Sequence, residues 1–431
     1  MTQVAWSPAG STRGRGFDLV GAGIACACVL MLVIYSQGWV MPLTGETPQA
    51  DSNSLVRALF FPAYAIGLGM LAMSPRDTAL AALRQPFLLI LLAIVGISVT
   101  WSIAPDQSAR RAVAVYLTTL GGVALAVRYR WAQMTEVIAA TFALLAVVAL
   151  LAGLLTPSLG RMSEIFPGAW RGVWPEKNAL GGNMALGFIS LAAAAMLNPR
   201  RAWLWWSFAA LTLALVLLST SKTSLVSLLL GAGALVFVAL IRRGPVMRIA
   251  TIWAGVVGVV LSAAVLLFAA DVVFNLLGKD ATFTGRTLIW DAAMRQIEQR
   301  PWTGFGYEAV WTLKGVWGPL AWIVKDAGFK PQHAHNAWIE QWLGLGVFGL
   351  AAFALMWVET AVLAAVAIFR ERGAYLAAPF LLVYGLMSLT ESVAVTYNDL
   401  RWVLFVAVAV KLAWPDRPLD VNPRPAVARR R

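Results

Sequence analysis

Charged residues are scarce in this sequence: Asp, Glu, Lys and Arg make up 13% of its 431 residues, against about 25% in a typical soluble domain. The two cysteines, Cys26 and Cys28, lie close together in one apolar run. This excludes a disulfide scaffold and does not fit the ligand spacing of a zinc site. Hydrophobic residues reach 60%, which excludes disorder and indicates a membrane protein.

Long apolar runs follow one another along most of the chain. A helix needs about 20 mainly apolar residues to cross the hydrocarbon core of a bilayer, and about twelve segments approach that length. We therefore expect an all-α integral membrane protein with about twelve transmembrane helices. The segments are 19–41, 54–73, 86–103, 112–127, 136–155, 178–197, 202–218, 224–241, 246–270, 347–369, 374–389 and 400–414.

Basic residues collect in every second connection between these segments. The positive-inside rule then places both ends of the chain in the cytoplasm. This orientation explains most of the net charge of +13, so no nucleic-acid partner is expected. The first apolar segment follows Arg13 and Arg15, as a signal peptide would, but it is long and many spans follow it, which indicates an uncleaved anchor.

One long connection, expected on the outer side, interrupts the series of spans. Loops of this length in compact proteins are usually functional, and this one contains both histidines of the chain. The expected organisation is spans one to nine in 1–270, a catalytic loop with amphipathic helices in 271–345, spans ten to twelve in 346–416 and a basic cytoplasmic tail in 417–431.

Arg286 opens a predicted amphipathic helix in this loop. Ile289, Ala293 and Ile297 share one face of the helix, and Thr284 is the expected N-cap. A cation in the first turn faces the positive end of the helix dipole, which is unfavourable unless an anion is bound between the guanidinium and the exposed amides. The alternative is an arginine that points to solvent.

His335 precedes a second predicted helix of the loop, 337–343. A histidine at a helix N-terminus is pushed toward its neutral form, which suits a general base that deprotonates a hydroxyl. The alternatives are a structural histidine or a metal-ligand pair with His333. The pair lacks a neighbouring cluster of cysteines or carboxylates in the sequence, so we favour the base and predict no metal.

Further cations on the predicted outer side stand near the starts of predicted spans. Lys222 lies in a run of Ser and Thr, where it could hold a phosphate oxygen although the glycines of a P-loop are missing. Arg171 and Lys177 precede the sixth span, and Arg161 lies upstream. A snorkelling side chain is the alternative for each. Trp290 is one of several outer tryptophans that suit either sugar rings or packing onto the bilayer.

Together these motifs resemble the bacterial O-antigen ligase and polymerase superfamily, over roughly residues 161–350. The motifs are Arg171-Gly172 before Lys177-Asn178, Ser221-Lys222-Thr223-Ser224, Thr284-Gly285-Arg286 before Trp290, Pro301-Trp302-Thr303-Gly304-Phe305-Gly306-Tyr307, and His333-Ala334-His335-Asn336 before Gly344-Leu345-Gly346.

The resemblance implies an inner-membrane enzyme that transfers a glycan from undecaprenyl diphosphate to an acceptor hydroxyl at the periplasmic face, without a metal or another cofactor. It implies His335 as the group that activates the acceptor, places the loop arginine of the family at Arg286, and puts Arg171 where arginines of the family contact the diphosphate. Lys222 stands where many ligases have arginine. The predicted substrate-binding residues are Asn336, His333, Arg161, Lys177, Asn178 and Trp290.

Two activities share this donor. The Ser-Lys-Thr-Ser and Thr-Phe-Thr-Gly-Arg runs look more like exopolysaccharide polymerases, which join repeat units, than like ligases, which move finished glycan onto lipid A-core or another acceptor. A transporter of lipid-linked sugar is the alternative from another class, but charges within the spans are sparse, with Glu359 the clearest. Predicted partners are the lipid-linked oligosaccharide, the acceptor glycan or lipid A-core, the bilayer, and export and chain-length proteins.

Overall fold

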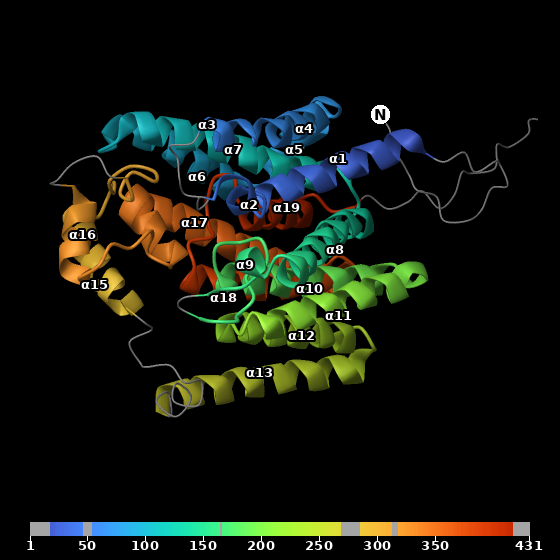
Figure 1. Ribbon diagram of the computed structural model, residues 1–431. Coiled ribbons are helices and arrows are strands. Elements are labelled where there is room, and N and C mark those ends of the chain that lie inside the picture. Colours follow the sequence, from blue (N-terminus) through green and yellow to red (C-terminus); the bar gives the residue numbers. More distant parts are fainter. Residues whose placement is uncertain (1–17, 46–53, 164–165, 269–284, 313–317, 417–431) are drawn as a thin grey trace, which may run out of the picture.

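The computed structural model describes residues 18–45, 54–163, 166–268, 285–312 and 318–416. Over these ranges the chain is helical, and β pairing is limited to one isolated bridge between Arg161 and Trp170. Long helices run side by side, with α15 (Arg286–Ile297) and α16 (Pro319–Ala327) gathered at one end of the bundle (Figure 1). The predicted all-α class is confirmed.

Each of the twelve predicted segments falls on a helix. The main helices are α1 (Leu19–Tyr35), α4 (Phe61–Ala72), α6 (Pro86–Ile97), α7 (Pro105–Arg128), α8 (Trp131–Leu155), α10 (Lys177–Leu197), α11 (Ala202–Leu218), α12 (Lys222–Ile241), α13 (Pro245–Phe268), α17 (Ala337–Arg370), α18 (Ala374–Thr390) and α19 (Leu400–Ala413). Short elements between them are α2 (Val40–Thr44), α3 (Ser54–Ala58), α5 (Pro75–Leu83), η1 (Ser98–Trp101), α9 (Pro157–Gly160) and η2 (Pro199–Arg201).

Eight helices in the described ranges are long and apolar enough to cross a membrane. A ninth span results if the pair Pro75–Leu83 and Pro86–Trp101, bent by 91°, counts as one. Helices α1 and α18 have 17 residues each and α19 has 14, less than the roughly 20 that a full crossing needs. The molecule is a multi-pass membrane protein, whereas the count of twelve and the periplasmic position of the long loop stay predictions.

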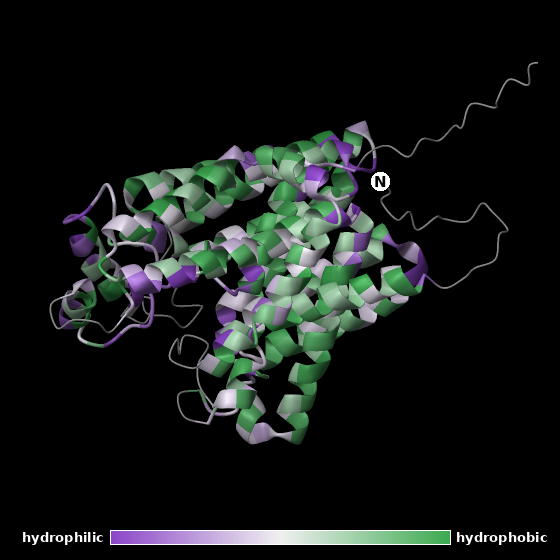
Figure 2. Ribbon diagram, turned by 90° about the horizontal axis from the view of Figure 1, so that it is seen from above, coloured by the Kyte–Doolittle hydropathy of each residue, from purple (hydrophilic) through white to green (hydrophobic). Residues whose placement is uncertain are grey.

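Apolar side chains cover the long helices, and hydrophilic residues gather toward helix ends and connections (Figure 2). Helix α10 lies deepest: it packs against α8, α11, α12 and α18, and 89% of its apolar window is buried. Small residues permit this close approach. A Cβ added at Gly181 would lie 2.4 Å from the Ser224 hydroxyl oxygen on α12. The N-termini of α10 and α12 are therefore held side by side.

The start of α17 is fixed by a break in the helix at Gly346, which has φ 68°. Residues 301–306 fill the break. The amides of Phe305 and Gly306 donate to the carbonyls of Leu343 and Gly344 at 3.0 and 2.9 Å. The amide of Val347 donates to the Pro301 carbonyl at 2.9 Å. The two glycine-containing motifs of the long loop are thus packing partners, and they set the direction in which α17 begins.

Replacing Gly346 with alanine is expected to destabilise the protein by about 2 kcal/mol or more, because φ is positive and the added methyl group would meet a carbonyl. The Trp302 carbonyl oxygen would lie 2.0 Å from that Cβ. The measurement is the temperature at which the detergent-purified protein loses its monodisperse size-exclusion peak. Gly233→Ala in α12, where a Cβ meets nothing within 4 Å, is the matched control. Equal transition temperatures for both variants would contradict the expectation.

Candidate active site

His335 is held in an unusual backbone conformation directly before α17. Its φ is 50°, in the left-handed region, which costs a residue other than glycine about 1 kcal/mol or more. The next residue, Asn336, caps α17 by accepting from the amides of Trp338 and Ile339 at 3.0 and 3.2 Å. Trp290 of α15 donates from Nε1 to the Ala334 carbonyl at 2.8 Å. Two predicted substrate-binding residues, Asn336 and Trp290, therefore hold the histidine segment in place.

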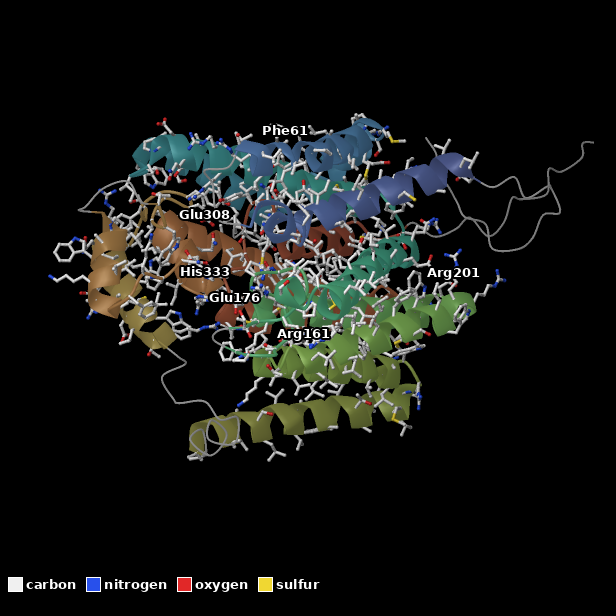
Figure 3. The ribbon with its side chains drawn as sticks, in the orientation of Figure 1. Phe61, Arg161, Glu176, Arg201, Glu308 and His333 are labelled. Atoms are coloured by element: carbon white, nitrogen blue, oxygen red, sulfur yellow. The ribbon has the colours of Figure 1, made fainter. Side chains whose placement is uncertain are left out.

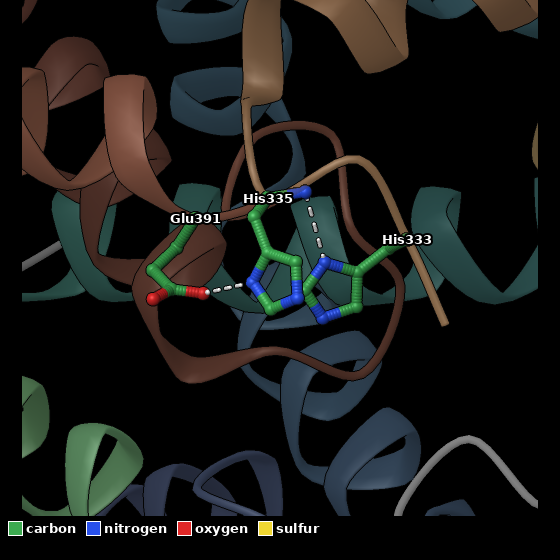
Figure 4. Close-up of side chains that lie close together, drawn as sticks. All are labelled: His333, His335 and Glu391. Atoms are coloured by element: carbon green, nitrogen blue, oxygen red, sulfur yellow. Dashed lines mark hydrogen bonds and ion pairs between the residues drawn. The ribbon is translucent and has the colours of Figure 1, made fainter. Parts of the chain in front are cut away.

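The His335 ring is paired with Glu391, the residue that follows α18 (Figure 4). Its Nδ1 lies 3.1 Å from Oε2 of Glu391, and the Nη2 of Arg286 lies 3.0 Å from Oε1. Burial raises the pKa of the Glu391 carboxyl, but the hydrogen bond with His335 and the charge of Arg286 outweigh this and hold the pKa at about 2. Glu391 is therefore ionised near neutral pH.

The ionised partner fixes the tautomer of His335. A carboxylate only accepts hydrogen bonds, so the proton between the two groups belongs to Nδ1 of His335. In the neutral ring the lone pair then lies on Nε2, and this is the nitrogen that can take a proton from a substrate. The arrangement supports the predicted general base and adds a carboxylate partner that the sequence analysis did not name.

His333 packs against His335, with ring centroids 3.9 Å apart and the ring planes tilted by 49°. Its Nδ1 accepts from the backbone amide of His335 at 3.2 Å (Figure 4). Burial and the neighbouring His335 lower the pKa of His333 to about 3. The His333 ring is thus neutral across the physiological range, and it supports the backbone of the base without adding a charge.

Glu340, on the first turn of α17, joins three segments around the histidines. Its Oε1 accepts from the Ala334 amide at 2.6 Å and from the Ser392 hydroxyl at 3.0 Å. Its Oε2 accepts from Nε1 of Trp311 at 2.6 Å. The Ser392 hydroxyl oxygen also lies 3.3 Å from Nδ1 of His333. One half-buried carboxyl group thereby connects the histidine segment, the Trp311 loop and the segment that carries Glu391.

A cavity with an empty volume of about 1570 Å³, open to solvent, adjoins His335. His333 and His335 line it together with Glu340, Glu391 and Ser392. The labelled side chains of Glu308, His333 and Glu176 lie near one another in Figure 3, and all three line the cavity. The other walls include the aromatic side chains Tyr35, Trp174, Trp311 and Tyr397. Aromatic faces beside polar groups suit a sugar.

The predicted cations Arg171 and Arg161 hold backbone carbonyls. Arg171 donates from Nε to Leu159 at 2.9 Å and from Nη2 to Ser158 at 3.1 Å. Arg161 donates from Nε to the Gly153 carbonyl at 3.0 Å, and its guanidinium lies 5.1 Å from the Trp170 ring centroid. Neither is among the described residues that line the cavity. The structure does not bring these two arginines to His335.

Lys177 and Lys222 begin the neighbouring helices α10 and α12, and their positive charges repel each other. The ammonium of Lys177 lies 3.5 Å from the Phe166 ring centroid. Asn178 lines the cavity, and its Oδ1 accepts from the Ser221 hydroxyl at 2.8 Å. Of the predicted substrate-binding residues before the long loop, Asn178 is thus the one that reaches the cavity.

Two more arginines line the cavity and were absent from the predicted site. Arg401 donates from Nε to Oδ1 of Asp399 at 3.0 Å and from Nη2 to Oδ2 at 2.5 Å. Arg111 donates to the Glu308 carbonyl, and its guanidinium lies 5.7 Å from the Tyr397 ring centroid. The sequence signal for Asp399 and Arg401 was a charged pair in a short connection between two apolar runs.

His333, His335 and Glu391 also have potential ligand atoms within 4.8 Å of one another, a spacing at which a metal ion could be held. The surrounding charges disfavour a cation, because Arg286 already pairs with Glu391. The geometry thus fits a base with an ionised partner better than a metal centre, and the absence of a metal stays a prediction.

Comparison with known proteins finds similarity to one family and to one curated relative. Residues 207–354 match the family model described as O-Antigen ligase, a region that contains Lys222, Arg286 and His335. The chain is 28% identical over 279 residues to the exopolysaccharide production protein ExoQ of Rhizobium meliloti (strain 1021), and the match covers 61% of this chain and 61% of that protein. Both findings confirm the resemblance that the motifs predict, to the O-antigen ligase and polymerase superfamily.

Proposed function

We propose that this protein is a metal-independent glycosyltransferase of the inner membrane, which transfers a glycan from undecaprenyl diphosphate to an acceptor hydroxyl at the periplasmic face, with both termini in the cytoplasm. The observation that carries the proposal is His335 on the cavity wall, with its Nδ1 on an ionised Glu391. An imidazole held in this way is suited to accept a proton from a hydroxyl.

In the proposed reaction, Nε2 of His335 takes the acceptor proton while the acceptor oxygen attacks the anomeric carbon of the donor. The new glycosidic bond forms as the bond from that carbon to the diphosphate oxygen breaks, and the diphosphate leaves with the electron pair. A single displacement inverts the anomeric centre. Glu391 then faces an imidazolium and stabilises it. General base catalysis of this kind contributes about 10²- to 10⁴-fold in rate.

The leaving diphosphate requires cations. Lys222, with Lys177 beside it, is proposed to meet the diphosphate at the starts of α10 and α12, where exposed helix amides add to the positive potential. Arg171 is proposed to join them by exchanging its carbonyl partners for phosphate oxygens. His333, Asn178 and the aromatic walls are proposed to orient sugar rings.

Polymerisation of lipid-linked repeat units is the first proposal, and ligation of finished glycan to lipid A-core or another acceptor is the alternative. The printed name of the relative, an exopolysaccharide production protein, favours the polymerase. Export and chain-length proteins are proposed partners of such an enzyme. Transport of lipid-linked sugar is the weaker alternative, because it gives no role to the pair of His335 and Glu391.

His335→Ala is expected to abolish transfer nearly completely at a normal protein level, because the base is lost. The measurement is the length of glycan on undecaprenyl diphosphate in a deletion strain that carries either the wild-type gene or the variant. Accumulated single repeat units would identify a polymerase, and long stranded chains would identify a ligase. Arg295→Gln, which removes an exposed ion pair with Asp326 on α15, is the control. Normal export from the His335→Ala strain would refute the assignment.

Exhaustive treatment of the purified protein with EDTA is expected to leave the transfer rate unchanged, because the proposed chemistry uses a histidine base and protein cations. The measurement is transfer between lipid-linked oligosaccharides in metal-free proteoliposomes, before and after addition of Mg²⁺, Mn²⁺ or Zn²⁺. A rate that disappears with the chelator and returns with one of these ions would instead assign His333, His335 and Glu391 to a metal site.

A further inference from the structure

We propose that Arg286 is a positioning residue, which acts on His335 through Glu391 and does not contact the donor diphosphate itself. The inference rests on the proposed function, since it assigns a role within that reaction. It differs from the expectation raised by the sequence, where Arg286 was a candidate anion-binding cation.

Both terminal nitrogens of Arg286 are directed to the end of α18. Nη2 lies 3.0 Å from Oε1 of Glu391, and Nη1 donates to the Thr390 carbonyl. Only 17% of the Arg286 side chain is exposed. Glu391 and His335 line the cavity, whereas Arg286 is not among the described residues that do. The guanidinium therefore lies behind the carboxylate, on the side away from the substrate.

The two oxygens of Glu391 are divided between the two partners. Oε1 is bound by Arg286 and Oε2 by His335, so the carboxylate cannot turn without losing one of them. The bond to the Thr390 carbonyl ties the same guanidinium to the backbone beside Glu391. The chain from Arg286 to Glu391 to His335 thus fixes the plane of the imidazole, in the way that outer partners orient ligand and catalytic histidines.

Arg286 also limits how strongly Glu391 holds a proton on His335. The charged and titratable groups that act on Glu391 are Arg286 from α15, His335 and His333 from the histidine segment and Arg401 from α19. Arg401 is committed to Asp399 through two nitrogens, and His333 is neutral. Among the described residues, Arg286 is thus the cation in direct contact with the carboxylate, and it offsets the pull of Glu391 on the imidazolium proton.

The test compares Arg286→Gln, Glu391→Gln, the double variant and Arg286→Lys in proteoliposomes, with a purified lipid-linked oligosaccharide as substrate. Arg286→Gln is expected to lower kcat about 100-fold through misplacement of the base and to leave the donor KM within about twofold. The double variant is expected to be no slower than the slower single variant, because the two residues act as one unit. Arg295→Gln on the same helix is the control.

The pH dependence of the rate provides a second readout. Loss of Arg286 leaves Glu391 free to stabilise the imidazolium, so the acidic limb of the pH–rate profile is expected to move to higher pH. Glu391→Gln removes the negative charge, and the limb is expected to move to lower pH. Arg286→Lys retains the charge but not both hydrogen bonds. Compared with Arg286→Gln, it is expected to return the acidic limb of the pH–rate profile to its wild-type position and to recover only part of kcat.

The opposite result is equally defined. A donor KM raised tenfold or more by Arg286→Gln, with kcat and the pH profile unchanged and effects that multiply with those of Glu391→Gln, would overturn the inference and return Arg286 to the diphosphate. If Arg286→Gln does not fold, Arg286→Lys decides by the same KM and pH readouts. Wild-type protein that transfers nothing would refute the proposed function, independently of the role of Arg286.

Discussion

A half-buried carboxylate is held in its ionised form by the groups that pair with it, and the pairing of Glu391 determines how the candidate site is arranged. The residue lies in a wall of the cavity with Arg286 at 3.0 Å and His335 at 3.1 Å. Removing one partner would leave this carboxylate, whose side chain is 24% exposed, with only part of its compensation. The constraint therefore acts over a distance: α15, the histidine segment and the end of α18 must all be in place before the ion pairs can form. The pair of His335 and Glu391 therefore forms only in the assembled fold.

The backbone conformation of His335 also depends on contacts from several segments of the fold. A left-handed conformation at a histidine is unfavourable by itself, and it persists because its neighbours are fixed from both directions. Asn336 caps α17, and Glu340 accepts from the Ala334 amide one residue before His335. The break at Gly346, filled by residues 301–306, sets where α17 begins. Gly346 and the glycines of residues 301–306 thus contribute to the site through packing, and the strain at His335 is offset by hydrogen bonds elsewhere.

The sequence predicts elements better than it predicts partners. All twelve apolar windows coincide with helices, because hydropathy is a local property of the chain. The predictions of Arg286 and His335 also rest on local arguments about helix starts, and the structure places both beside Glu391. Glu391 itself lies 105 residues from Arg286 and 56 from His335, and no periodicity reports a contact at such a separation. Arg171 shows a second limit of the sequence. An arginine that precedes a span can bind an anion or hold backbone carbonyls, and the sequence alone does not distinguish the two; in the structure Arg171 holds the carbonyls of Ser158 and Leu159.

The cations near the site fall into two groups with different surroundings, which indicates different roles. Arg286 and Arg401 are each paired with a carboxylate, Glu391 or Asp399, and so present little net charge to the cavity. Lys177 and Lys222 bring like charges together at two helix starts, where they repel each other and face the positive ends of the helix dipoles. An anion between them would relieve both costs, whereas an anion at Arg286 would have to displace Glu391 from its ion pair. On these grounds we propose that Arg286 positions His335, and that the two lysines, with Arg171, meet the departing diphosphate. In this proposal the reacting carbon of the donor lies between the two groups, with the acceptor on the side of His335.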